Sequence, residues 1–533
     1  MALPGGPRGR LPVPLAPVLA LVGGLCQAAS IASPWNGAPL WWLQLLSLGL
    51  LVVLLDRSAT ARQAALAGWV FATAWLTGTF WWLFISMYTY GGLAAPLAAL
   101  AVLGLAAFLA LYYGAAAAFY RACAPTSAAG RALLFGAVWL LAELLRGSWF
   151  TGFPWGAGGY AHLDGAAHWL APWVGVYGLG AVAAAAAALL ANRLLARRWA
   201  GAAGTAAVVL LGSCWPASGT PDAPDAAAAP PLSIALLQGN IPQDEKFQPG
   251  SGVPVALQWY AEQLQAAKAS LVVAPETAIP LLPQDLPDGY ADTLHKRFSQ
   301  GTQAALFGIP LGSMREGYSN SVLGLAPGRA EPYRYDKHHL VPFGEFIPPG
   351  FRWFTEMMNI PLGDFNRGEV GQPSFAWQGQ RLALNICYED LFGDELGRRF
   401  RDPATAPTIF VNVSNIGWFG DTVAIDQHLN ISRMRALEFA RPMVRATNTG
   451  ATVVIDHRGR VTASLEPYTR AVLETQVEGR GLTAARGWDL TPYARWVSRL
   501  GLAPLWVAAL AGMLLAAGAA LRRRRAGAGR TTD

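Results

Sequence analysis

Three short segments of this 533-residue chain combine residue types that could carry out acyl transfer. Leu271-Val272-Val273-Ala274-Pro275-Glu276 ends an apolar run in a carboxylate, and Asn385-Ile386-Cys387-Tyr388-Glu389-Asp390 ends another in a thiol. The third segment, 335–345, holds Lys337 and then Glu345 in a Pro/Gly turn. A thiolate can attack a carbonyl, a carboxylate can take the thiol's proton, and an ammonium with a backbone N–H can stabilise the oxyanion. The residue types suffice for acyl transfer, but their spacing does not show that they meet in space.

Cys387 is one of four cysteines and has no disulfide partner in its own part of the chain. Cys26 and Cys214 lie in apolar spans, and Cys123 lies in a loop between spans. A structural cysteine would more naturally lie within a strand than at its end, although taken alone a cysteine is more often a small core residue. A reactive thiol is the leading hypothesis.

The polar part of the chain, 232–485, alternates short apolar runs with helical patterns, which predicts an α/β domain of a size that one core can support. Pro275 ends its strand just before Glu276, so this carboxylate should project from the carboxyl edge of a sheet, where α/β folds bind ligands. The expected helices are Val255 to Ala267 and Ile425 to Ala440, and the expected strands are Leu232 to Leu237, Ser270 to Ala274, Ala304 to Ile309, Leu382 to Ile386, Thr408 to Val413 and Thr452 to Ile455.

The composition places the rest of the chain in a membrane. Hydrophobic residues make up 53% and charged residues only 14%, where a soluble protein has about a quarter charged. The spans have roughly the 20 residues that a crossing helix needs, although the fifth and seventh are short. We expect eight: Leu11 to Ile31, Ala38 to Leu55, Ala64 to Met87, Leu93 to Phe119, Ala132 to Leu145, Trp169 to Leu190, Trp199 to Trp215 and Leu500 to Leu521.

Arginines predict the orientation, because Lys and Arg near span ends resist translocation. They occupy the N-terminus, every second loop and the C-terminal tail, so both termini should be cytoplasmic and the polar insert should lie outside. We favour an uncleaved first span over a signal peptide. The expected domains are seven helices in 1–216, a linker in 217–231, the catalytic domain in 232–485, and the eighth helix with its basic tail in 486–533.

Several other classes are disfavoured. The net charge of +7 reflects arginines scattered at membrane edges, which does not indicate a nucleic-acid partner. His338 and His339 are adjacent and therefore point apart, with no third ligand at suitable spacing, so we expect neither a metal nor a cofactor. A transporter would be expected to show broken helices or internal repeats, and neither is apparent.

The three chemical segments together resemble the Glu-Lys-Cys triad of the nitrilase superfamily. Their combination with eight spans resembles the membrane-embedded apolipoprotein N-acyltransferase family, and the resemblance runs from about residue 10 to 520. Supporting stretches are 237–243, 143–147, 151–155, 418–421 and 433–438. The resemblance implies a membrane α-helical bundle with an extramembrane α/β domain built as an αββα sandwich.

The resemblance also implies a ping-pong reaction in a bacterial inner membrane, with the catalytic domain on the periplasmic side. A phospholipid's acyl group would pass to Cys387 as a thioester, and then to the α-amino group of the diacylglyceryl-cysteine of an apolipoprotein. Glu276 would be the base and Lys337 the oxyanion stabiliser, with Glu345 orienting the lysine. Tyr388 and Glu389 would line the pocket of a monomeric enzyme.

Aromatic residues near these segments are candidate substrate-binding residues. The segment from Phe346 to Phe365 could be ordinary core or a lid that touches the membrane. Phe247 stands where the family pattern has a tryptophan, and it keeps an apolar ring but lacks the N–H donor. Separately, Ile416-Gly417 replaces the Asp-Ala of the pattern before Trp418. The candidates are Phe247, Phe343, Phe351, Trp353 and Trp418.

Alternatives stay open. A membrane-tethered amidase or nitrile hydrolase would use the same triad with water as acceptor, and only its products would differ. A non-catalytic lipoprotein-binding protein would predict a damaged triad. Glu389 could instead cap a helix. Glu143 and Arg146, three residues apart on one helical face, could be functional or could brace the loop at 153–155.

Overall fold

The computed structural model describes residues 15–212, 230–329, 331–348, 350, 364–481 and 490–528. The chain divides into two compact units, each described by itself. One comprises Met1–Trp81, Pro96–Ala217 and Leu502–Asp533, and the other comprises Trp82–Ala95 and Ser218–Gly501.

The first unit is helical and apolar. Short 3-10 turns at Trp149–Thr151, Gly158–His162 and His168–Leu170 form the connection between two of its helices. The helices are α1 (Leu15–Ile31), α2 (Trp41–Arg57), α3 (Ala61–Phe80), α5 (Ala95–Cys123), α6 (Ala128–Ser148), α7 (Ala171–Leu195), α8 (Trp199–Gly212) and α15 (Ala503–Ala528).

Each of the eight expected spans coincides with an apolar helix, but the count of eight crossings is not confirmed. Within the described residues, four helices are long and apolar enough to cross a membrane, or up to five if Ala61–Phe80 and Leu83–Tyr90 count as one span. Helices α1 and α8 are shorter, with 17 and 14 residues. The third expected span, Ala64 to Met87, is not one straight helix, because α3 ends at Phe80 and a bent continuation, Leu83–Tyr90, follows it.

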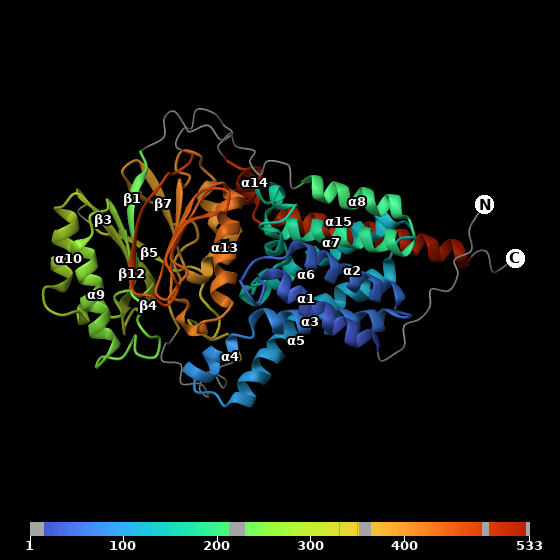
Figure 1. The fold of residues 1–533 in the computed structure, drawn as a ribbon, viewed down its shortest axis with the longest axis horizontal. Helices are drawn as coiled ribbons and strands as arrows, with labels where there is room; N and C mark the ends of the chain where they lie inside the picture. The colour runs from blue at the N-terminus through green and yellow to red at the C-terminus, as the bar shows by residue number, and fades with distance from the viewer. Residues whose placement is uncertain are drawn as a thin grey trace. The chain divides into compact units, whose positions relative to one another are not determined.

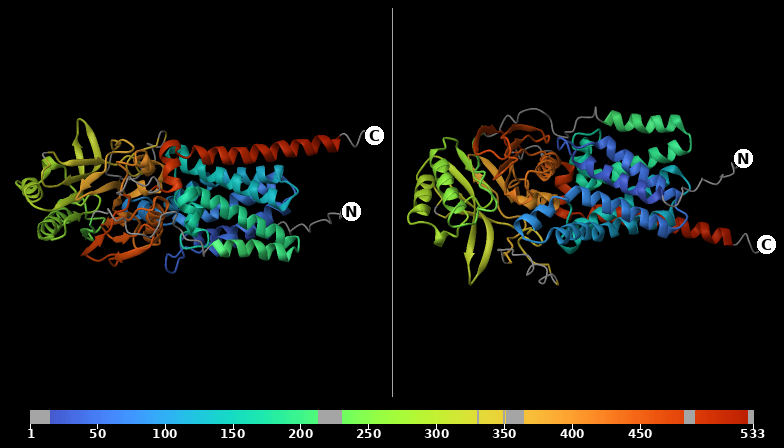
Figure 2. Two further views of the ribbon diagram at one scale, coloured as in Figure 1. Left: turned by 90° about the horizontal axis from the view of Figure 1, so that it is seen from above. Right: turned by 60° about the horizontal axis from the view of Figure 1, so that its bottom comes forward.

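Small residues let helices of the first unit approach closely, as is common where lipid removes the hydrophobic drive between helices. A methyl group at Gly24 of α1 would collide with the main chain of α3 at Phe71, and one at Gly136 of α6 would lie 2.9 Å from the carbonyl oxygen of Ala181 in α7. Helix α15 packs along α6, so the C-terminal helix joins the bundle formed by the N-terminal ones (Figure 2).

Glu143 and Arg146 both brace the loop that follows α6. The Glu143 carboxylate accepts from the Gly158 N–H at 2.6 Å, and Arg146 Nη1 donates to the carbonyls of Phe153 and Trp155 at 2.7 and 2.8 Å. In the described part of the chain the two side chains do not pair with each other. The geometry favours the bracing role over a direct ion pair.

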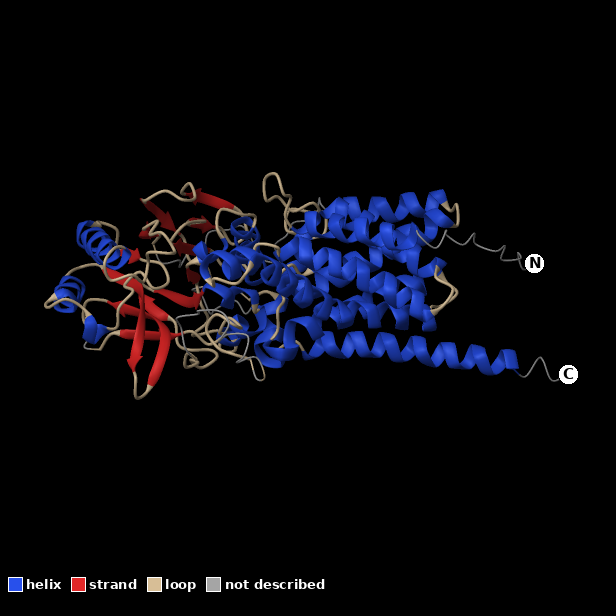
Figure 3. Ribbon diagram, turned by 90° about the horizontal axis from the view of Figure 1, so that it is seen from below, coloured by secondary structure: helices blue, strands red, loops and turns tan. Residues whose placement is uncertain are grey.

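The second unit is built on two six-stranded sheets (Figure 3). The first sheet has the order β12-β1-β2-β3-β4-β5 and the second β11-β10-β9-β8-β7-β6. Strands β1, β2 and β3 are parallel, as are β7, β8 and β9. The strands are β1 (Leu232–Gln238), β2 (Leu271–Val273), β3 (Ala304–Ser313), β4 (Gly317–Leu325), β5 (Tyr333–Asp336), β6 (Phe375–Trp377), β7 (Gln380–Ile386), β8 (Ile409–Ser414), β9 (Met443–Thr447), β10 (Val453–Ile455), β11 (Val461–Ser464) and β12 (Ala471–Val477).

Helices cover the outer faces of both sheets, which gives the αββα order that the resemblance implied (Figure 1). Helices α9 (Gly252–Ala266) and α10 (Tyr290–Ser299) lie on the first sheet, and α13 (Ala424–Phe439) lies on the second. The unit also contains α4 (Leu83–Ile85), α12 (Gly393–Gly397), α14 (Pro492–Leu500) and the turns Ser86–Tyr90, Pro283–Asp285, Cys387–Leu391, Arg398–Phe400 and Ile416–Phe419.

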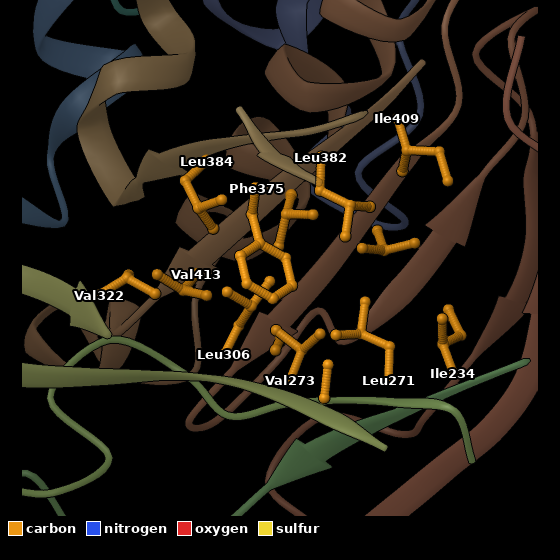
Figure 4. Close-up of a cluster of buried hydrophobic side chains, with 14 of the residues drawn as sticks. Ile234, Leu271, Val273, Leu306, Val322, Phe375, Leu382, Leu384, Ile409 and Val413 are labelled. Carbon is orange, nitrogen blue, oxygen red and sulfur yellow. The ribbon is translucent and has the colours of Figure 1, made fainter. Parts of the chain in front are cut away.

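The inner faces of the two sheets form one apolar core. Val273 and Leu306 of the first sheet face Leu384 and Val413 of the second, with the Phe375 ring between them (Figure 4). Each of these side chains is buried, and burying a side chain of this size is worth about 1.5–3 kcal/mol. This core fixes the sheets against each other and so fixes the strand ends that carry the polar residues.

The segment that follows α3 belongs to the α/β unit by its contacts. Trp82 is 1% exposed, its indole N–H donates to Gln427 Oε1 at 3.0 Å, and its ring centroid lies 4.3 Å from that of Phe419. Tyr90 makes an edge-on contact with Trp418. The apolar run at 82–90 therefore packs within the α/β unit.

Candidate active site

The three residues predicted to carry out the chemistry all lie at or just after the end of a strand. Cys387 follows β7, Lys337 follows β5, and Glu276 lies three residues after β2. Strand β2 runs parallel to β1 and β3, and β7 runs parallel to β8, so Glu276 and Cys387 lie at carboxyl edges of facing sheets. The structure thus brings together residues that are 50 to 111 positions apart in the sequence.

Lys337 lies between two carboxylates. Its Nζ donates to Glu345 Oε1 at 2.8 Å and to Glu276 Oε1 at 3.3 Å. Asn320, on β4, holds the same two acids, because its Nδ2 donates to Glu276 Oε1 at 2.7 Å and to Glu345 Oε1 at 2.9 Å. One ammonium and one amide therefore separate two buried carboxylates that would otherwise repel each other.

The charges of this cluster are mutually dependent. Burial acts to lower the pKa of Lys337, but the carboxylates of Glu276 and Glu345 outweigh it, so the net effect raises this pKa above its usual value. Burial acts to raise the pKa of Glu276, but the Lys337 ammonium and the Asn320 amide outweigh burial, so the net effect lowers this pKa. At neutral pH the lysine is an ammonium and Glu276 is a carboxylate.

Cys387 is a free, partly exposed thiol in a strained turn. Its φ is 53°, a left-handed conformation that costs a non-glycine residue about 1–2 kcal/mol. Burial and the Glu276 carboxylate together raise the pKa of the thiol to about 12, although the Lys337 ammonium acts to lower it. The resting group is therefore a neutral thiol that needs a base, and the nearby acid that influences it most strongly is Glu276.

Two further contacts orient Glu276. Its Oε2 accepts from the backbone N–H of Asn415, just after β8, at 2.8 Å. Its own backbone carbonyl accepts from Lys246 Nζ at 3.0 Å. Lys246 is 1% exposed and, within the described residues, has no carboxylate within ion-pair distance. Burial lowers the pKa of Lys246 to about 7, and the Glu276 carboxylate partly opposes this shift.

Glu389 is fully engaged as an acceptor. Its Oε2 accepts from the Ile386 N–H at 2.6 Å and the Tyr335 hydroxyl at 2.8 Å, and its Oε1 accepts from the His338 and His339 N–H groups at 2.6 and 3.2 Å. It caps its own turn and ties the lysine segment to the cysteine turn. Tyr388 is 4% exposed, and its ring contacts those of His339 and Phe392.

The five candidate substrate-binding residues fall into two groups. Phe247 is half-exposed with the Lys246 ammonium 5.8 Å from its ring centroid, Trp418 contacts Tyr90, and Phe343 is partly exposed in the turn before Glu345. Phe351 and Trp353, with most of the expected lid at 346–365, lie outside the described residues.

The adjacent histidines do not point apart as expected, because His338 Nε2 lies 3.8 Å from Glu395 Oε1, the oxygen that His339 also contacts. His338 Nδ1 lies 2.8 Å from the carbonyl oxygen of Gly368, and His339 Nδ1 lies 3.0 Å from Glu395 Oε1. No group of three or more His, Cys, Asp or Glu side chains suited to a metal ion is present in the described part of the chain.

Asn320, Lys246 and Asn415 were missed in the sequence analysis. Asn320 lies in the middle of a strand, and Asn415 acts through its backbone, so neither carries a local signal. Lys246 was detectable in principle, because it immediately precedes Phe247 in a stretch that carries part of the resemblance.

Comparisons with known proteins match the two units separately. Residues 233–486 match the carbon-nitrogen hydrolase family, and residues 23–189 match the apolipoprotein N-acyltransferase N-terminal domain. Among solved structures, an amidase of the nitrilase superfamily from Nesterenkonia covers 54% of this chain and 100% of its own at 16% identity, with a TM-score of 0.36. By class, the protein carries a carbon-nitrogen hydrolase domain together with a set of apolar helices.

Curated relatives match almost the whole chain. Proteins named apolipoprotein N-acyltransferase are 64% identical in Verminephrobacter eiseniae, over 91% of this chain and 92% of that protein, and 45% identical in Ralstonia nicotianae, over 98% and 97%. One from Bordetella bronchiseptica is 40% identical over 97% and 99%. The chain belongs to the apolipoprotein N-acyltransferase family.

Proposed function

We propose that this protein transfers a fatty acyl group from a phospholipid, through a thioester on Cys387, to the α-amino group of the diacylglyceryl-cysteine at the N-terminus of an apolipoprotein. Family membership supports the activity. The observation that carries the roles of the residues is the buried Glu276–Lys337–Glu345 cluster at the strand edge beside the Cys387 thiol.

In the first half-reaction the Cys387 sulfur attacks the ester carbonyl carbon as its proton passes to Glu276. The carbonyl oxygen becomes an oxyanion, which the Lys337 ammonium and a backbone N–H stabilise. Collapse breaks the ester C–O bond, and the lysophospholipid oxygen leaves with the proton held by Glu276. The acyl group remains on sulfur.

In the second half-reaction the neutral α-amino nitrogen attacks the thioester carbonyl carbon. Its surplus proton passes to Glu276, the C–S bond breaks, and Glu276 returns the proton to the departing sulfur. The products are an amide and the free thiol, so one carboxylate serves as base and then as acid in both halves.

The unequal contacts of Lys337 suit this cycle. Its 2.8 Å bond to Glu345 is the shorter one, and its 3.3 Å contact with Glu276 is the longer. When an oxyanion forms, the lysine can keep Glu345 and exchange Glu276 for the new charge. That exchange withdraws the cation that lowers the pKa of Glu276, so the base strengthens as the proton arrives.

The remaining features follow from membrane substrates. Both the phospholipid donor and the diacylated acceptor carry acyl chains, which explains why a carbon-nitrogen hydrolase domain is attached to apolar helices. We propose that the protein is a monomer in a bacterial inner membrane. Its α/β unit would lie on the periplasmic side, because the arginines follow every second span. Phe247, Phe343 and Trp418 supply apolar surface near the cluster for the chains.

Product analysis separates this proposal from a tethered amidase. The purified protein is incubated with phospholipid and a synthetic diacylated lipopeptide, and the products are identified by mass spectrometry. The proposal requires N-acylated peptide and lysophospholipid in equal amounts. Free fatty acid without acylated peptide would indicate hydrolysis, and no change in either substrate would indicate binding alone.

A further inference from the structure

A buried polar network lies behind the nucleophile, on the side of the second sheet covered by α13. Its four side chains are at most 1% exposed. His428 and Ser432 come from α13, Asp390 comes from the turn Cys387–Leu391, and Arg445 comes from β9. None of the steps proposed above uses these groups.

Hydrogen bonds in this network determine the tautomer of His428. Arg445 Nη2 lies 3.2 Å from His428 Nδ1, and a guanidinium can only donate, so Nδ1 is the acceptor. The ring proton is therefore on Nε2, which lies 3.0 Å from Asp390 Oδ1 and 3.2 Å from the Cys387 carbonyl oxygen. With Nδ1 occupied and Nε2 protonated, His428 is a neutral donor and has no lone pair to offer the thiol.

The remaining contacts hold the ring in place. Asp390 Oδ2 accepts from the Ser432 hydroxyl and lies 3.5 Å from Arg445 Nη1, which also donates to Ser432 and, at 3.0 Å, to the His428 carbonyl. The Asp390 carboxylate and the Arg445 guanidinium balance each other's charge.

The Cys387 carbonyl is thus held from one side by two donors. Asn412 Nδ2, from β8, lies 3.3 Å from the same oxygen that His428 approaches. In a trans peptide the N–H points opposite to the C=O, so fixing this carbonyl also fixes the direction of the Tyr388 N–H. Fixing this carbonyl also helps to hold Cys387 in its left-handed conformation. Such a conformation persists only where neighbouring groups hold it in place.

We propose that His428 is a positioning residue, which donates to the Cys387 carbonyl and so orients the Cys387–Tyr388 peptide plane with the sulfur and the backbone N–H toward the substrate carbonyl. The inference rests on the proposed role of Cys387 as nucleophile. It assigns Asp390, Arg445 and Ser432 the task of holding the imidazole as a neutral Nε2–H donor.

The test compares His428→Gln with His428→Met in the full-length protein in detergent micelles. The glutamine Nε2 can donate from nearly the same place as the histidine Nε2, whereas methionine matches the volume without a donor. Acyl-enzyme formation is measured by quenched intact-mass analysis against phospholipid concentration and pH, with the apparent melting temperature recorded for each variant. His295→Met, an exposed histidine on α10, controls for the substitution itself.

His428→Met is expected to lower the maximal acylation rate at least about tenfold, with the half-saturating phospholipid concentration unchanged. Complete loss of an oxyanion donor costs about 100- to 1000-fold in rate, and a smaller loss is expected here because the Tyr388 N–H is displaced but not removed. His428→Gln is expected to recover most of that loss, with an unchanged pH dependence. A glutamine variant as slow as the methionine variant, or one with a shifted pH profile, would overturn the inference in favour of a histidine acting as base.

Two further outcomes are decisive. If wild type forms no thioester, the proposed function fails; if wild type and His428→Met acylate equally fast, only the positioning role fails. Should His428→Met not fold, Ser432→Ala replaces it, since it removes hydrogen bonds to Asp390 and Arg445 and leaves both charges. A several-fold slower acylation at unchanged half-saturation is then expected, and an unchanged rate contradicts the inference.

Discussion

Asn320 separates two carboxylates at the centre of the site and is the residue that local sequence patterns were least able to reveal. It lies within an ordinary strand, between Ser319 and Ser321, and nothing in its neighbourhood signals a functional role. Its amide acts only because the sheet brings Glu276 and Glu345 to it from 44 and 25 positions away. Side-chain contacts of this kind depend on tertiary structure alone.

Replacing Asn320 with Ala should slow acyl-enzyme formation about 10- to 100-fold, because a hydrogen bond to a buried charge is worth about 1.5–3 kcal/mol. Without the amide, Glu276 and Glu345 lose the donor that they share and compete for Lys337, so the base and the ammonium are no longer held in place. The rate is measured by quenched intact mass. Ser321→Ala is the matched control, since it removes the neighbouring buried hydrogen bond to Asp336 outside the cluster. A rate for Asn320→Ala within about threefold of the control would show that the bridge is dispensable.

Lys246 leads to a prediction about pH and stability. Its pKa in the folded protein is about 7, below the usual 10.5, so between these values the unfolded chain binds the extra proton. The free energy of unfolding therefore rises with pH between these two values, and the destabilisation caused by burying the Lys246 ammonium is fully present below pH 7. The apparent melting temperature of wild type should gain more between pH 7 and pH 9 than that of Lys246→Met. Lys268→Met, an exposed lysine on the same unit, should behave like wild type; equal gains in all three proteins would refute the assignment.

At the scale of elements, Glu389 connects the segment that holds Lys337 to the turn that holds Cys387. Four donors from β5, the lysine segment and the end of β7 converge on its two oxygens. From the sequence, Glu389 could be a pocket residue or a cap, and its contacts are those of a cap that also joins the Lys337 segment to the Cys387 turn.

Glu389→Gln should destabilise the protein by about 1–3 kcal/mol, since its amide NH2 must face backbone N–H donors in either orientation. The melting temperature and the acylation rate should fall together, because the Lys337 and Cys387 segments lose their common anchor. Both are measured on the same preparation, with Glu474→Gln on β12 as the control. Loss of turnover at an unchanged melting temperature would instead mean that Glu389 acts on the substrate.

Strands with strong apolar runs were predictable from sequence, and the rest were not. All six expected strands are confirmed, as β1, β2, β3, β7, β8 and β10. Glu276, Cys387 and Asn415 follow β2, β7 and β8. Strands β4, β5, β6, β9, β11 and β12 were not predicted, because their sequences are short, polar or mixed and contain no strong apolar run. The segments of Glu276, Lys337 and Cys387 could be identified from the sequence. The residues that hold Glu276 in place, which are Asn320, Lys246 and Asn415, were not identified from it.

For the whole molecule, hydropathy predicted where apolar helices occur but not how the third one ends. No proline directly follows α3, and its last glycine, Gly78, lies inside the final turn and not after it. The indole of Trp82 packs instead on Phe419 and hydrogen-bonds Gln427, so the end of that helix reflects contacts with residues more than 330 positions later. A window-based reading cannot detect such a contact.

The most direct test of the account is the mass of the intact protein after incubation with phospholipid alone and then with a diacylated lipopeptide. Wild type should gain the mass of one fatty acyl group, and the gain should disappear as the peptide becomes N-acylated. Cys387→Ser should show neither change, because a serine hydroxyl lacks the accessible ionisation of a thiol. If Cys387→Ser acylated the lipopeptide as fast as wild type, the central role of this sulfur would be contradicted.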